Sequence, residues 1–289
     1  MFGIIGIVVI LVMVFGGYIV HGGSMGPILE ALPFEIIMIG GAAVGAFLIS
    51  NDLASIKHTV KDIGKVFKGS KWKPADYREL LCLLFELVRL AKSNPVGLEE
   101  HVENPGASSI FGKYSRIQHD HDAVDLICDT LRAASMNYDD PHQVEEVLDK
   151  RMEAHLHHAM HSSHAMQSMA DGLPALGIVA AVLGVIKTMG SIDQPPEVLG
   201  AMIGSALVGT FLGVFLAYGL MGPFAARVKQ VVEDDAHFYQ LIREVLVANL
   251  HRHPANICIE VGRQNTPHHV RPGFSDLEEA LRVLKQDAA

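Results

Sequence analysis

The sequence predicts an all-α integral membrane protein with four transmembrane helices and a helical cytoplasmic domain. Hydrophobic residues make up 49% of the 289 residues, charged residues only 19%, and the mean hydropathy is +0.27, which is high for a soluble protein. Four apolar windows approach or exceed the roughly 20 residues that a helix needs to cross a bilayer. Between the windows, apolar residues recur at helical spacing and no strand-rich run is present.

The first two windows predict a transmembrane hairpin over residues 1–50. The window at 2–20 has no charged residue, and the window at 33–50 has one, Glu35, near its start. The second window is marginal alone and is compatible with a buried core helix, but its pairing with the first favours a membrane hairpin. The N-terminus lacks the cationic region and the cleavage site of a removable signal peptide.

The last two windows predict a second hairpin over residues 171–223, with spans at about 172–190 and 198–223. The third window is free of charge from Gly172 to Ile186, and the fourth carries no charge. A short connection joins the two windows, as in a helical hairpin. We expect this hairpin to form the channel of the protein if ions cross the membrane.

The distribution of Lys and Arg predicts the orientation in the membrane, because loops rich in these residues stay on the cytoplasmic side. Cations follow the second and fourth windows, whereas the connection at 21–32 has none. These cations are Lys57, Lys61, Lys65, Lys68, Lys71 and Lys73, then Arg227 and Lys229. The segments 51–170 and 224–289 are therefore predicted to be cytoplasmic, with both termini inside.

The two cytoplasmic segments are predicted to be helical. Apolar residues at helical spacing mark helices at about 77–92, 121–134, 238–250 and 275–285. Asp140 and Pro141 have the residue types that cap and begin a helix. The three cysteines, Cys82, Cys128 and Cys258, match no zinc-binding spacing and are expected to be free thiols.

Small residues recur at intervals of four in the second hairpin, and they predict a face where helices approach closely. Two interpretations remain open, namely packing between helices of one subunit or a surface reserved for the helix of a partner. The residues of this predicted packing face are Gly177, Gly184, Ser205, Gly209 and Gly213.

Two further positions of the hairpin are candidates for an ion pathway. Ala181 and Thr210 lie near the middle of their windows, so we expect them at similar depth. Pro174 and Pro223 fall at the cytoplasmic ends of these helices, where a proline frees a carbonyl group and permits bending. The sequence offers no carboxylate near mid-membrane, and we therefore expect the titratable group of a proton path to come from another chain.

The histidines offer a weak candidate for a metal site. His157, His161 and His164 share one face of a predicted helix, with His155 and His158 nearby, and imidazoles four residues apart can chelate zinc, nickel or copper. No cysteine or carboxylate completes a known motif, so a solvated polar face is the favoured interpretation.

Composition and motifs argue against several classes of function. No nucleophile lies in a motif with a base, and no phosphate-binding loop is present, so neither an enzyme nor a cofactor is predicted. The net charge of −9 argues against a nucleic-acid partner.

Several stretches resemble the MotA family of flagellar motor stator subunits, which belongs to the MotA/TolQ/ExbB proton channel family. The longest are GLPALGIVAAVLGVIKTMG (172–190) and LGAMIGSALVGTFLGVFLAYGLMGP (199–223). VFGGYIVHGGSMG (14–26), LEEHVENP (98–105) and IEVGRQ (259–264) also match. The similarity runs over nearly the whole chain.

The resemblance implies a four-span protein of the bacterial inner membrane, in contact with lipid, with five copies around a dimeric partner, MotB. The single transmembrane aspartate of the partner would be the titratable group. Ion flow past this aspartate would drive rotation, and the segment 51–170 would push the switch complex of the rotor. TolQ and ExbB, which energise the outer membrane, are an alternative, but the two spans before the large loop argue against them. A histidine-rich metal-binding membrane protein and a structural scaffold are the alternatives of other classes.

The resemblance also assigns roles to individual residues. The two functional prolines of the family fall on Pro174 and Pro223, and its channel-facing threonine falls on Thr210. Sodium-using relatives have a threonine where this chain has Ala181, so proton coupling is expected.

For the rotor contact, the conserved acidic residue of the family corresponds to Glu99. The stretch AKSNPVG (91–97) is shorter than is usual in the family. The cationic partner is therefore assigned to Lys92, with Arg89 as the alternative.

Overall fold

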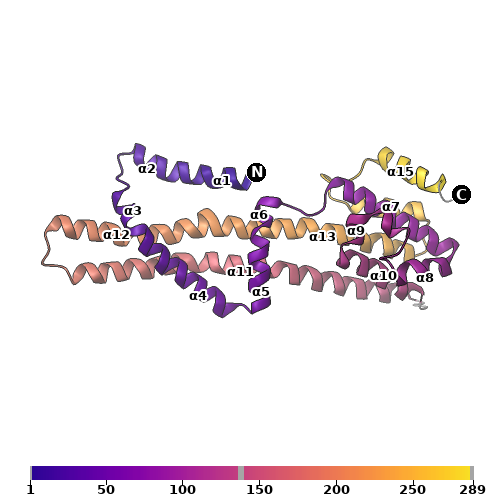
Figure 1. The fold of residues 1–289 in the computed structure, drawn as a ribbon, viewed down its shortest axis with the longest axis horizontal. Coiled ribbons are helices and arrows are strands. Elements are labelled where there is room, and N and C mark those ends of the chain that lie inside the picture. The colour runs from indigo at the N-terminus through magenta and orange to yellow at the C-terminus, as the bar shows by residue number, and fades with distance from the viewer. Residues whose placement is uncertain (1, 136–139, 287–289) are drawn as a thin grey trace. The chain divides into compact units, whose positions relative to one another are not determined.

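The structure is a computed structural model that describes residues 2–135 and 140–286, and the regular elements in these ranges are all helices (Figure 1). The chain divides into two compact units. We call Met1–Gly69 together with Ala159–Val231 the membrane unit, and Ser70–His158 together with Val232–Ala289 the polar unit.

The membrane unit contains the four apolar helices, each long and apolar enough to cross a membrane, so the predicted number of spans is confirmed. Three of them include a short π-helical segment, a widening that is frequent at functional sites. In chain order the elements are α1 (Phe2–Leu11), η1 (Val12–Gly16), α2 (Gly17–Val20), α3 (Gly26–Glu35), η2 (Ile36–Gly40), α4 (Gly41–Ser50), α11 (Pro141–Met189), α12 (Pro196–Phe215), η4 (Leu216–Met221) and α13 (Gly222–Leu250). The first parts of α11 and the later parts of α13 belong to the polar unit.

The second span begins earlier than the expected residue 33. Helix α3 starts at Gly26, and Pro27 lies in its first turn, where the missing N–H of proline has no helical partner to lose. Pro33 therefore lies inside the helix instead of at its start. As a result, Glu35 lies well within the second membrane helix.

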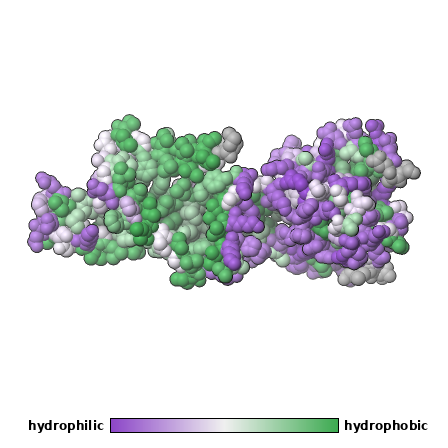
Figure 2. Space-filling model, in the orientation of Figure 1, coloured by the Kyte–Doolittle hydropathy of each residue, from purple (hydrophilic) through white to green (hydrophobic). Residues whose placement is uncertain are grey.

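Large apolar side chains cover the surface of the membrane unit (Figure 2). Val12 is 60% exposed, Ile37 71% and Ile178 56%. A soluble monomer rarely exposes apolar surface on this scale, so these faces contact lipid or other chains. Beyond the second span, helices α5 (Leu53–Ile63) and α6 (Lys65–Lys68) carry four of the predicted cytoplasmic lysines.

The polar unit is built around α7 (Pro74–Ser93), which is buried on most of its circumference. Its other elements are α8 (Pro95–Glu103), η3 (Phe111–Lys113), α9 (Ser115–Gln118), α10 (His121–Ser135), α14 (Ala255–Asn265) and α15 (Phe274–Gln286). The predicted helices of the cytoplasmic segments are thus present. Beside α7, the Trp72 ring stacks on the Phe238 ring, with centroids 3.7 Å apart and planes at 6°.

The three cysteines are free and buried in the polar unit, as expected of isolated thiols. Burial raises the pKa of the Cys82 thiol to about 11 and that of the Cys128 thiol to about 12. Both thiols are therefore protonated at neutral pH, which makes them poor nucleophiles and poor metal ligands.

The Trp72–Phe238 stack predicts a large loss of stability when the partner ring is removed. Phe238 is fully buried, so we expect Phe238→Ala to lower the free energy of unfolding by about 3–5 kcal/mol. Fluorescence of Trp72, the single tryptophan of the chain, reports unfolding of the detergent-solubilised protein. Phe274→Ala is the control because Phe274 is 59% exposed, and equal losses in the two variants would contradict the assignment of the core.

Candidate functional site

Helices α11 and α12 touch through their backbones in the second membrane hairpin, where they run side by side (Figure 1). A Cβ atom placed on Gly177 would lie 2.8 Å from the carbonyl oxygen of Gly209 and 3.0 Å from the Cα atom of Gly213. A Cβ atom on Gly184 would lie 2.6 Å from the Cβ atom of Ala206. Any side chain at these glycines would push the two helices apart.

The contact decides where the predicted small-residue face points. Gly177, Gly184, Gly209 and Gly213 face the neighbouring helix of the same subunit. Of the two interpretations left open by the sequence, packing within one subunit accounts for these four glycines. Ser205 instead lines a cavity beside the contact.

Ala180 of α11 and Gly209 of α12 touch, and Ala181 and Thr210 are the residues that follow them. The Cβ atom of Ala180 is 3.2 Å from the position that a Cβ atom of Gly209 would take. Because the helices are antiparallel, Ala181 and Thr210 lie at a similar level of the hairpin, and both are half-buried. Their side chains are therefore close to the glycine contact without being enclosed by it.

A carboxylate lies at this same level, contrary to expectation. The Oε2 atom of Glu35 is 2.7 Å from the position that a Cβ atom of Gly209 would take. Glu35 is 5% exposed, and its buried Oε2 has no hydrogen-bond partner among the described residues. The sequence predicts no carboxylate near mid-membrane, yet Glu35 packs against Gly209, the neighbour of Thr210 near the middle of the fourth apolar window. The cause is the early start of α3, which moves Glu35 from the end of a helix into its interior.

Glu35 opens onto a cavity of 640 Å³ between α3, α11 and α12. Its polar lining includes Glu30, Lys187, Thr188 and Ser205. Charged side chains inside membrane segments generally face the protein interior or a water-filled cavity. The cavity supplies such an environment for one side of the Glu35 carboxylate.

Both prolines lie where a regular helix is interrupted or constrained. Pro174 is inside α11 and leaves the carbonyl of the preceding turn without its helical donor. The carbonyl oxygen of the adjacent Leu173 lies 2.7 Å from the position of a Cβ atom on Gly213. Pro223 is the second residue of α13, which directly follows the π-helical segment η4. Bending at Pro174 would move Leu173, which lies next to the glycine contact.

The predicted rotor-contact residues lie in the polar unit. Lys92 is in the last turn of α7, and Glu99 is in α8; both are exposed. The amino group of Lys92 donates a hydrogen bond to the carbonyl oxygen of His253, rather than pairing with Glu99. Arg89, the alternative cation, is half-buried in α7.

The histidines that were predicted as a weak metal candidate have other surroundings. His157, His161 and His164 are exposed on α11, and the His155 ring packs against the Tyr239 ring at 4.9 Å. A different group of ligand-type side chains converges within the described ranges, namely His142, Glu145 and His251. The sequence pattern does not reveal this group because His251 is far along the chain from the other two residues.

Comparison with known proteins identifies the family. A family model described as Motility protein A N-terminal matches residues 4–95, and the MotA/TolQ/ExbB proton channel family model matches residues 120–240. The chain is 39% identical to Motility protein A of Escherichia coli (strain K12) over 285 residues, which are 98% of this chain and 95% of the relative. It is 34% identical to Chemotaxis protein LafT of Vibrio parahaemolyticus, over 96% and 97% of the two chains.

Two solved structures share the fold. The structure of C. jejuni MotAB aligns with a TM-score of 0.71 and 20% identity, covering 92% of this chain and 95% of that one. The flagellar MotAB stator complex of Bacillus subtilis aligns with a TM-score of 0.68 and 22% identity, covering 96% and 98%. Together with the 39% identity to Motility protein A over 98% of the chain, these matches show that the chain is a multi-pass membrane protein of the MotA family, within the MotA/TolQ/ExbB proton channel family.

Proposed function

We propose that the chain is the stator subunit of a bacterial flagellar motor that, with a MotB-type partner, couples proton flow across the inner membrane to torque on the rotor. The identity of 39% with Motility protein A over 98% of the chain carries this proposal. The match of the Motility protein A N-terminal model to the first hairpin supports this role over that of TolQ or ExbB.

The solved relatives, which are described as MotAB complexes, support a MotB-type partner and an oligomeric assembly. The chain assembles as a homo-oligomer, in five copies, around two single-span helices of the partner. The large exposed apolar side chains of the membrane unit supply surface for these contacts and for lipid. Both termini lie in the cytoplasm, which the lysines after the second span support.

The ion path runs beside Ala181 and Thr210, where the aspartate of the partner supplies the main titratable group. Glu35 is a second carboxylate at this level, and it relays protons between the cavity and the aspartate. Pro174 and Pro223 transmit the movement of the hairpin towards the cytoplasm. The burial of Glu35 beside Gly209 supports its place on the path, since a charged side chain in a membrane is expensive without such a role.

The coupling ion is the proton because Ala181 offers only a methyl group. Sodium is a hard cation that needs several oxygen ligands in place of its water, whereas a proton needs only a carboxylate and water. We expect cells that depend on this chain and its partner to stop swimming when a protonophore collapses the proton gradient, even with sodium present. The measurement is swimming speed in a strain without other stators. Full speed under these conditions would contradict proton coupling.

The rotor contact involves exposed charges of the polar unit, with Glu99 as the acidic residue and Lys92 as the favoured cation. Exposed ion pairs are worth about 0–1 kcal/mol each, which suits a contact that must form and release at every step. We expect Glu99→Lys to lower torque markedly while membrane insertion stays normal, and a reversed charge on the rotor to restore part of it.

Glu100→Lys is the matched control for this prediction, because Glu100 is the exposed neighbour of Glu99 on α8. Torque is read from the rotation speed of tethered cells. Normal rotation of Glu99→Lys, both alone and combined with Lys92→Glu, would rule out this pair as the rotor contact. Arg89→Glu then tests the alternative cation.

A further inference from the structure

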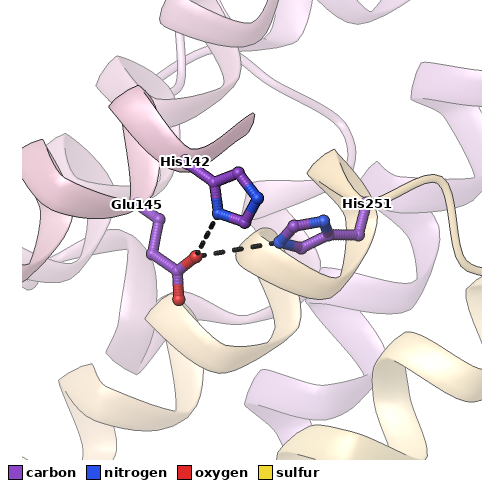
Figure 3. Close-up of side chains that lie close together, drawn as sticks. All are labelled: His142, Glu145 and His251. Carbon is purple, nitrogen blue, oxygen red and sulfur yellow. Dashed lines mark ion pairs between the residues drawn. The ribbon is translucent and has the colours of Figure 1, made fainter. Parts of the chain in front are cut away.

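Three ligand-type side chains converge in the polar unit, at the first turn of α11 and the end of α13 (Figure 3). The Oε2 atom of Glu145 lies 3.7 Å from Nδ1 of His142 and 3.7 Å from Nε2 of His251. The three ligand atoms all lie within 4.8 Å of one another. The two imidazole rings stand 5.4 Å apart at 63°, so both present a nitrogen to the same carboxylate oxygen.

The backbone under each ligand is fixed. The backbone N–H of His142 donates to Oδ1 of Asp140 at 3.0 Å, which caps α11. Val144, beside Glu145, is buried in the core of the polar unit. The N–H of His251 donates to the carbonyl oxygen of Val247 at 3.1 Å. The three side chains therefore start from well-determined positions and need only their own rotations to adjust.

Glu145 is oriented by a neighbour on α13. Its Oε1 atom accepts a hydrogen bond of 3.0 Å from Arg243, which leaves Oε2 directed at the two imidazoles. Arg243 also pairs with Asp149 at 2.7 Å and with Glu244 at 2.8 Å. Three carboxylates thus surround one guanidinium group, so the local charge remains negative and favours a cation at Oε2.

We propose that His142, Glu145 and His251 form a binding site for a zinc-like divalent cation. Two imidazoles and one carboxylate suit zinc, cobalt or nickel. In a tetrahedral zinc site, ligand atoms lie about 3.4 Å apart, given metal–ligand distances of about 2.1 Å. The two distances of 3.7 Å need only a small contraction, and the side chain of His142, at 78% exposure, is free to move inward.

The proposed site is open to solvent, and a water molecule completes the coordination. A bound cation would join the first turn of α11 to the residue that follows α13, so it would hold together two segments of the polar unit that are distant in sequence. The site is structural and exchangeable. Its occupancy would stabilise the folded protein by an amount that grows with the logarithm of the free cation concentration once that concentration exceeds the dissociation constant.

The test is equilibrium dialysis of the full-length, detergent-solubilised chain against zinc chloride, after removal of metal with a chelator. We expect the unmodified protein to bind one zinc ion per chain at this site. His251→Asn and Glu145→Gln should each weaken zinc binding at least about tenfold. The control replaces the exposed histidines of α11, as His157→Asn, His161→Asn and His164→Asn combined, and should leave this binding unchanged.

A second measurement keeps the outcome clear if a variant folds poorly. Fluorescence of Trp72 gives the melting temperature with and without zinc, and zinc should raise it for the unmodified protein and the control but not for His251→Asn. Absence of zinc uptake by the unmodified protein would overturn the proposal and leave a histidine–glutamate ion-pair cluster. Full zinc affinity in His251→Asn, or its loss in the control, would also overturn it.

Discussion

The backbone contact between α11 and α12 is the constraint on which the membrane unit depends. Inside a bilayer, lipid tails are as apolar as leucine side chains, so helices associate through close packing rather than through the hydrophobic effect. Gly177, Gly184 and Gly213 let two backbones approach until their atoms touch. The many weak dispersion contacts that this approach permits add up to a large attraction. The small residues of these two helices therefore serve packing within the subunit itself.

The same contact brings a carboxylate next to the proposed ion path. Gly209 faces Ala180 of α11 and also faces the Glu35 carboxylate from α3. Only a residue without a side chain leaves room for both neighbours. Placing a charged group at the centre of a membrane costs roughly 3 kcal/mol or more of free energy. The cavity beside α3 lowers this cost for Glu35, but it borders only one side of the carboxylate. The buried Oε2 atom of Glu35 has no hydrogen-bond partner among the described residues, which favours the proposed role in proton transfer.

Much of the fold could be predicted from the sequence, since hydropathy adds up along each helix and needs no tertiary information. The spacing of Gly177, Gly209 and Gly213 predicted close packing, but the pattern alone did not reveal which helix they face. The apolar window predicts a helix that starts at Pro33 and so places Glu35 near its end, whereas α3 begins at Gly26. Pro27 marks the start of this helix, because proline is favourable in the first turn of a helix.

Contacts between distant segments were out of reach of sequence reasoning. The hydrogen bond between Lys92 and the carbonyl oxygen of His253 joins α7 to the segment between α13 and α14, and no local pattern predicts it. The same is true of His251, which meets His142 and Glu145 only through the tertiary fold. By contrast, His157 and His161 are four residues apart, and this spacing, which can be read from the sequence, predicts only a weak candidate for a metal site.

The most direct test of the account is the effect of Glu35→Gln on proton-driven rotation, with Glu30→Gln as the control. Glu30 lines the same cavity but is exposed. Glutamine keeps the shape of Glu35 but does not take up a proton. The account predicts that Glu35→Gln assembles normally with its partner and lowers rotation speed several-fold at low load, whereas Glu30→Gln rotates at normal speed. Normal rotation of Glu35→Gln would contradict the claim that the glycine contact places a working carboxylate beside Thr210.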